Sequence, residues 1–126
     1  MTTTAVVPME ILSEADGLSN KELDGLPFGA IQLSAEGTVL RFNEYEANLS
    51  NRRAPDTVGR NFFREVAPCT NVREFYGRFR DGINAGALNV TFDYRFAFKQ
   101  APRDVRVTLF YSDPTRTVWV FVQERS

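Results

Sequence analysis

Histidine is absent from this chain of 126 residues, and cysteine occurs only once, as Cys69. Without histidine, a thiol has no partner of the kind that most often takes its proton, so nucleophilic catalysis by Cys69 has little support. A single cysteine cannot supply the three or four ligands of a zinc site, and heme would lack its commonest axial ligand. An intrachain disulfide and a Cys-x-x-Cys redox pair are also excluded, which fits a reducing compartment.

Long apolar runs and an excess of charge of one sign are missing too. The first residues, "MTTTAVVPMEILSEADG", have neither the basic region nor the apolar run of a secretory signal. No apolar stretch approaches the length of a membrane span. The net charge is −1 with both signs interleaved, so sequence-independent nucleic-acid binding has little electrostatic support. We expect a cytoplasmic, monomeric protein that binds neither membranes nor nucleic acids.

Aromatic residues are what the chain has in abundance, with eleven Phe, four Tyr and one Trp. The hydrophobic fraction of 43% and the charged fraction of 25% are ordinary for a globular protein, and the length suits one domain with one core. The aromatic side chains can fill that core, or they can line a pocket for a flat aromatic ligand.

The C-terminal third has the alternation of β-strands. In "NVTFDYRFAFK" one face collects the apolar and aromatic residues Val90, Phe92, Tyr94, Phe96 and Phe98. The stretch "RDVRVTLFYS" repeats this pattern. In "TVWVFVQ" both faces are apolar, which predicts a central strand covered on both sides. The N-terminal helices are the best candidates to cover the second face.

The remaining segments predict helices and one hairpin. "MEILSEADGLSNKELDGL" favours one or two short helices, and "FGAIQLSAEGTVLRFN" favours a hairpin with "AEG" as its turn. Short helical pieces broken by Pro55, Gly59 and Pro68 follow, and then a longer helix near residues 73–85. This order predicts an α+β fold of the PAS type, with a single antiparallel sheet of about five strands and flanking helices. We assign residues 1–25 to an N-terminal cap and residues 26–126 to the core.

Four stretches resemble the photoactive yellow protein family. "ELDGLPFGAIQL", "GRNFFREVAPCT", "EFYGRF" and "WVFV" stand in the order and spacing of that family, over most of the chain from about Leu23 to about Val122. The resemblance implies a PAS-type fold and a blue-light photoreceptor rather than an enzyme. It also implies that Cys69 carries p-coumaric acid through a thioester, and that light isomerises this chromophore from trans to cis. An activated acyl donor can be transferred to the thiol without a histidine base.

The resemblance also implies a set of chromophore contacts. The residue matching Glu46 stays protonated in the family and donates a hydrogen bond to the chromophore phenolate, whereas the residues alone favour a solvated helix carboxylate. The second family donor is a tyrosine, and here the position holds Phe42. Ser50 stands where the family usually has threonine, four residues after Glu46. Tyr45 is a candidate replacement donor, although neighbouring residues of a helix point about 100° apart.

Five further positions complete the predicted site. Arg52 matches an arginine that covers the family's pocket as a lid, and its alternative is an exposed loop charge. Phe62, Tyr94 and Phe96 match residues that line the pocket, although as bare sequence they favour core positions over ligand contacts. Gln100 stands where better-known members have a methionine that assists thermal return to the trans state, so we predict slower dark recovery here.

Several functional alternatives remain open at the level of the residues. Cys69 fits a buried core thiol equally well, in a PAS-type domain that binds another small ligand without sensing light. Flavin-based photosensing is disfavoured, because "APCTN" lacks the Asn-Cys-Arg-Phe pattern of those receptors. If light removes the proton of Glu46, we expect the weakly patterned residues 1–25 to loosen as the signal. No motif encodes the downstream partner.

Overall fold

The fold is built around one antiparallel sheet of five strands in the order β2-β1-β5-β4-β3. The computed structural model describes residues 7–96 and 102–125. Phe98 and Gln100 lie outside these residues. The predicted α+β architecture with a single antiparallel sheet is confirmed. The strands are β1 (Gly29–Leu33), β2 (Val39–Phe42), β3 (Asn89–Phe96), β4 (Arg103–Ser112) and β5 (Thr117–Glu124).

Short helices precede the sheet and also connect β2 to β3. They are α1 (Met9–Glu14), a 3-10 turn (Ala15–Gly17), α2 (Asn20–Asp24), α3 (Glu44–Ser50), α4 (Ala54–Thr57), a π-helical turn (Phe62–Val66), a 3-10 turn (Pro68–Thr70), a second π-helical turn (Arg73–Gly77) and α5 (Arg78–Ala85).

The prediction that proline breaks the middle helices holds at Pro68, which stands at the break between two helical turns, and is wrong at Pro55, which lies within α4. Pro55 lies in the first turn of α4, and Pro68 begins the 3-10 turn that carries Cys69. A proline suits the first turn of a helix because its missing N–H has no intrahelical partner there. Gly59 does separate two helical pieces, with a φ of +93° that favours glycine.

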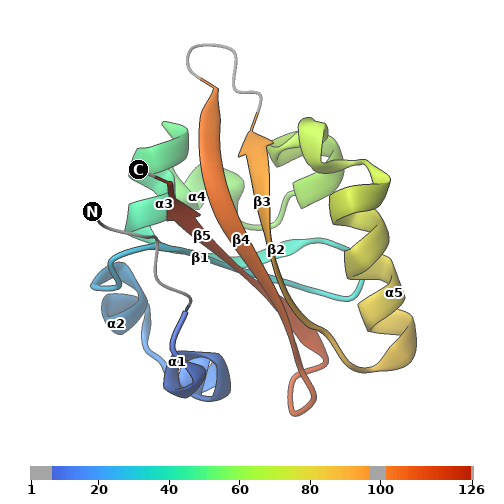
Figure 1. The fold of residues 1–126 in the computed structure, drawn as a ribbon. Coiled ribbons are helices and arrows are strands. Elements are labelled where there is room, and N and C mark those ends of the chain that lie inside the picture. Colours follow the sequence, from blue (N-terminus) through green and yellow to red (C-terminus); the bar gives the residue numbers. More distant parts are fainter. Residues whose placement is uncertain (1–6, 97–101, 126) are drawn as a thin grey trace.

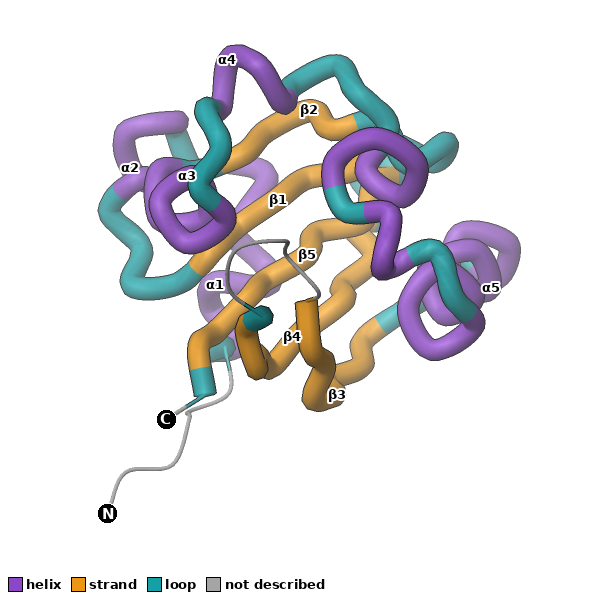
Figure 2. The backbone as a smooth tube through the Cα atoms, turned by 90° about the horizontal axis from the view of Figure 1, so that it is seen from above, coloured by secondary structure: helices purple, strands orange, loops and turns teal. Residues whose placement is uncertain are grey.

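Both faces of the sheet are covered, and β5 lies at its centre (Figures 1 and 2). Val118, Val120 and Val122 pack into the larger core, on the side of α5. Trp119 and Phe121 face the other way, into a second apolar cluster whose N-terminal members include residues of α1 and α2. The central strand and the N-terminal cover predicted from "TVWVFVQ" are both confirmed.

The edge strand β3 shows the predicted alternation. Thr91, Asp93 and Arg95 are exposed, whereas Phe92 and Tyr94 are half-buried and Phe96 is buried. Strand β1 differs, because all five of its residues are buried in spite of its polar residue Gln32. No helix among residues 7–96 and 102–125 is long and apolar enough to cross a membrane.

Candidate functional site

A cavity lies between α3, the π-helical turn Phe62–Val66 and the end of β3. It is partly open to solvent, and its enclosed free volume is about 10 Å³, roughly the space of one water molecule. The residues around it are Phe42, Glu46, Ser50, Arg52, Phe62, Val66, Ala67 and Phe96. Six of them are predicted site residues. The sequence did not single out the two small buried residues Val66 and Ala67, because nothing distinguishes them from ordinary core positions.

Glu46 is the one carboxylic acid in the described lining of this cavity. Its residue is only 3% exposed, and its Oε1 is buried without a hydrogen-bond partner in the described structure. Burial, with the negative charge of Glu124 as a smaller cause, raises the pKa of Glu46 from 4.5 to about 8. At neutral pH the side chain is therefore a neutral acid with an O–H to donate, not the solvated carboxylate that the residues alone favour.

Asn43 fixes the position of Glu46 in the fold. Its side chain caps α3, since its Oδ1 accepts a hydrogen bond from the N–H of Glu46 at 3.1 Å. The same oxygen accepts from the N–H of Ala30 at 2.9 Å, and the Nδ2 donates to the carbonyls of Leu23 at 2.7 Å and Phe28 at 3.0 Å. Asn43 was not among the predicted site residues, although an asparagine directly before "EYEANLS" is an N-cap signal.

The neighbours of Glu46 on α3 have other partners. The Ser50 hydroxyl lies in the cavity lining and donates to the Glu46 carbonyl at 2.7 Å. The Tyr45 hydroxyl donates instead to the Glu124 carboxylate at 3.0 Å, and Tyr45 is not part of the described cavity lining. In the described structure, Tyr45 is thus not a substitute for the hydroxyl missing at Phe42.

Arg52 lies at the surface of the molecule, next to the cavity. It is exposed, and it also lines the cavity. The chain reaches this place through Asn51, which ends α3 in the left-handed conformation with a φ of 56°. Arg52 is therefore the exposed, positively charged residue of the described cavity lining.

Cys69 is a half-buried free thiol beside the cavity rather than in its described lining. Its 3-10 turn begins one residue after Ala67, which does line the cavity. The Tyr94 hydroxyl donates to the carbonyl of Cys69 at 2.5 Å, and the Tyr94 ring lies 5.8 Å from that of Phe96. Burial raises the pKa of Tyr94, helped by the neighbouring Cys69 and Glu74, so this hydroxyl stays a donor that holds the turn in place.

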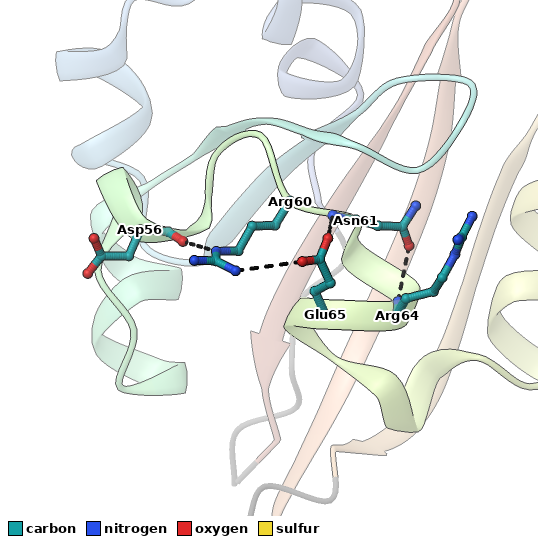
Figure 3. A network of polar contacts seen from close by, with 5 residues as sticks. All are labelled: Asp56, Arg60, Asn61, Arg64 and Glu65. Atoms are coloured by element: carbon teal, nitrogen blue, oxygen red, sulfur yellow. Dashed lines mark hydrogen bonds and ion pairs between the residues drawn. The ribbon is translucent and has the colours of Figure 1, made fainter.

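A polar network holds the segment that leads to Cys69 (Figure 3). Arg60 donates to the carbonyl of Asp56 at 2.7 Å and pairs with the Glu65 carboxylate at 3.6 Å. Glu65 also accepts from the N–H of Asn61, whose own Oδ1 accepts from the N–H of Arg64. These contacts join the end of α4 to the π-helical turn and so position Phe62 against the cavity.

This sheet, with a cavity between it and its helices, defines a sensor-type domain of the PAS class, and the model of the PAS fold family matches residues 20–125. The photoactive yellow protein of Rhodothalassium salexigens is 41% identical over 84% of this chain and 85% of its own length. That of Halochromatium salexigens is 38% identical over 90% and 91% of the two chains.

The crystal structure of the photoactive yellow protein domain from the sensor histidine kinase Ppr of Rhodospirillum centenum agrees with these sequence matches. Its TM-score is 0.86 at 42% identity, covering 90% of this chain and all of that one. The chain belongs to the photoactive yellow protein family. It is therefore a photoreceptor or sensor of the PAS class, and its relatives imply a chromophore.

Proposed function

We propose that this protein is a blue-light photoreceptor that carries p-coumaric acid as a thioester on Cys69. The observation that supports this most is the buried Glu46, a neutral acid whose Oε1 has no partner among the described residues. A buried polar group is nearly always hydrogen-bonded. Glu46 also lines the cavity, so a ligand with a polar end there would give its acid group a partner. When bound, the chromophore would supply light absorption and the trans–cis isomerisation.

The residues present fit such a group. A phenol exposed to water titrates near pH 10 as tyrosine does, so holding its anion in an apolar cavity requires a donor. Glu46 offers that donor, whereas Phe42 has no hydroxyl. Phe62 and Phe96 supply aromatic walls for a flat ring. Cys69 supplies the thiol, on a turn held by Tyr94.

The signal in this proposal begins with loss of the Glu46 proton. The resulting carboxylate would lie in the core, where an unpaired charge costs several kcal/mol. Asn43 binds the N–H of Glu46 and the carbonyl of Leu23, so a shift of α3 acts directly on the N-terminal segment. We propose that residues 1–25 act as a cap that loosens and residues 26–126 as the core. One structural relative is a domain of a sensor histidine kinase, which favours output to another signalling protein or domain.

Reconstitution tests this function. Purified apoprotein and a Cys69→Ser variant are mixed with activated p-coumaric acid, and absorption is recorded before, during and after blue light. We expect a visible band that bleaches and returns in the dark, and that is absent from the folded Cys69→Ser variant. A folded protein without such a band would contradict the proposal. It would favour instead a PAS-type domain that binds another small ligand, with Cys69 as a core thiol.

A further inference from the structure

Gly29, the first residue of β1, lies against the side chain of Glu46. A β-carbon built on Gly29 would stand 2.1 Å from Oε1 of Glu46, 3.1 Å from its Cδ and 3.2 Å from its Cβ. The first distance is far below any van der Waals contact. The carboxyl group thus fills the space that a side chain at position 29 would need.

The backbone on either side of this contact is fixed. Gly29 pairs with Val122 of β5, and β1 is bonded on its other edge to β2. The Asn43 side chain holds the carbonyl of Phe28 and the N–H of Ala30, the residues on both sides of Gly29, and the same amide holds the N–H of Glu46. Neither β1 nor the start of α3 can yield easily, so a side chain at position 29 must displace the carboxyl group itself.

We propose that Gly29 is a positioning residue for the Glu46 acid: its missing β-carbon is the space in which the buried carboxyl group rests. The contact between Gly29 and Glu46 concerns the chain alone. Only the expectation that the Glu46 acid faces a chromophore rests on the proposed photoreceptor function. A methyl group at position 29 drives the carboxyl group out of its buried place beside β1, toward the solvent that reaches the partly open cavity.

A double-mutant cycle on the apoprotein tests the contact, with Gly29→Ala measured alone and together with Glu46→Ala by urea unfolding at pH 6. Overpacking a core position by one methyl group is expected to lower the folding equilibrium constant roughly tenfold to hundredfold. Most of that loss should vanish when Glu46→Ala is also present. Gly17→Ala is the matched control, because nothing lies within 4 Å of a β-carbon at Gly17. Its effect should be the same with and without Glu46→Ala.

An equal loss from Gly29→Ala in both backgrounds would overturn the proposal, because the clash would then not be with the carboxyl group. If Gly29→Ala alone does not fold, the double variant decides. Recovery of folding with Glu46→Ala supports the proposal, and failure to recover overturns it.

A second readout separates positioning from a merely structural role. Carbon NMR of the Glu46 carboxyl group follows its titration in the folded apoprotein. Displacement from the buried place should lower the pKa of Glu46, with at least a tenfold rise in its acid dissociation constant in Gly29→Ala and none in Gly17→Ala. An unchanged titration in Gly29→Ala would contradict the proposal. Because neither readout needs a chromophore, failure of p-coumaric acid to attach to Cys69 would reject the photoreceptor function and leave this result standing.

Discussion

At the scale of single residues, the protonation state of Glu46 links its burial to the stability of the fold. Glu46 is buried in a cavity wall, and its pKa is raised from 4.5 to about 8. At a pH between 4.5, the ordinary pKa that applies to the unfolded chain, and about 8, the pKa in the fold, Glu46 is ionised in the unfolded chain and protonated in the folded chain. The folded state then binds more protons than the unfolded state, so stability falls as pH rises. The contribution of Glu46 to the free energy of unfolding is fully present below about pH 4.5 and is lost as the pH rises through about 8.

The first prediction concerns this pH dependence in the apoprotein. The free energy of unfolding should fall by about 1.4 kcal/mol per pH unit between about pH 5 and pH 8 from this group alone. Glu46→Gln, which keeps the shape and cannot ionise, should remove that slope. Urea unfolding at a series of pH values measures both proteins, and equal slopes would show that Glu46 is not the buried acid described above.

The second prediction concerns the donor missing at Phe42. In the reconstituted protein, Phe42→Tyr adds a hydroxyl to the cavity wall beside Glu46. Donors at the phenolate stabilise the ground state, in which negative charge is concentrated there, more than the excited state. The visible band should therefore move to shorter wavelength, and any protonated, shorter-wavelength form should diminish.

Absorption spectra of the two proteins at the same pH decide this prediction. Phe96→Tyr is a useful comparison, because Phe96 also lines the cavity and comes from β3 instead of β2. A band of Phe42→Tyr that moves to longer wavelength, or does not move, would contradict the expected direction.

At the scale of elements, a polar cluster joins the N-terminal segment to the sheet. Asp16, in the 3-10 turn after α1, accepts from the Trp119 indole N–H at 2.8 Å and from the hydroxyl of Ser112. The Thr115 hydroxyl donates to it at 3.3 Å. These partners come from β4, β5 and the turn between them, about one hundred residues away in the chain. The N-terminal cover is therefore held by directed bonds as well as by apolar packing.

The third prediction tests this link. Asp16→Ala removes the acceptor of a buried indole N–H, which should lower the free energy of unfolding by about 1–3 kcal/mol. Glu14→Ala, at an exposed carboxylate of the same segment, should change it by less than about 0.5 kcal/mol. Because Trp119 is the only tryptophan of the chain, its fluorescence reports the loss of this contact as well as unfolding. Equal effects of the two substitutions would show that the Asp16 cluster contributes little.

At this scale, local sequence patterns were sufficient to predict the strands but not every helix boundary. Alternation in β3 and two apolar faces in β5 were read correctly, because a period of two in side-chain direction is a local property of a strand. The prediction for Pro55 was wrong, because proline suits the first turn of a helix as well as a break between helices, and only the flanking hydrogen bonds distinguish the two. The six predicted residues of the cavity lining came from the family resemblance, not from periodicity.

At the scale of the whole molecule, the larger core, which includes residues of the cavity lining, and the N-terminal cover lie on opposite faces of one sheet. Strand β5 is common to both, because its valines face the larger core and Trp119 faces the cover. The Asn43 side chain also links α3 to α2, because it accepts a hydrogen bond from the N–H of Glu46 and donates one to the carbonyl of Leu23. A change at Glu46 therefore has a direct physical route to the far face.

The fourth prediction follows from that route. Illumination of the reconstituted protein should increase amide hydrogen exchange in the N-terminal segment up to about Gly25, with little change in the central strand β5. Glu46→Gln cannot form a buried carboxylate, so its light-induced increase should be smaller. Hydrogen-exchange mass spectrometry in light and darkness measures both proteins. Unaltered exchange in this segment would contradict the proposed loosening.

The sequence by itself determined the strand pattern, the central place of "TVWVFVQ", the single sheet and the family, because these depend on local periodicity and on motifs in fixed order. It did not determine the state of Glu46, the direction of Tyr45 or the role of Asn43. A pKa is set by burial and by charges such as that of Glu124, and these come together only when α3 packs against β1 and β5. The tertiary structure alone decided that the Glu46 carboxyl group is buried and neutral, with its Oε1 in the space left by Gly29 and without a partner among the described residues.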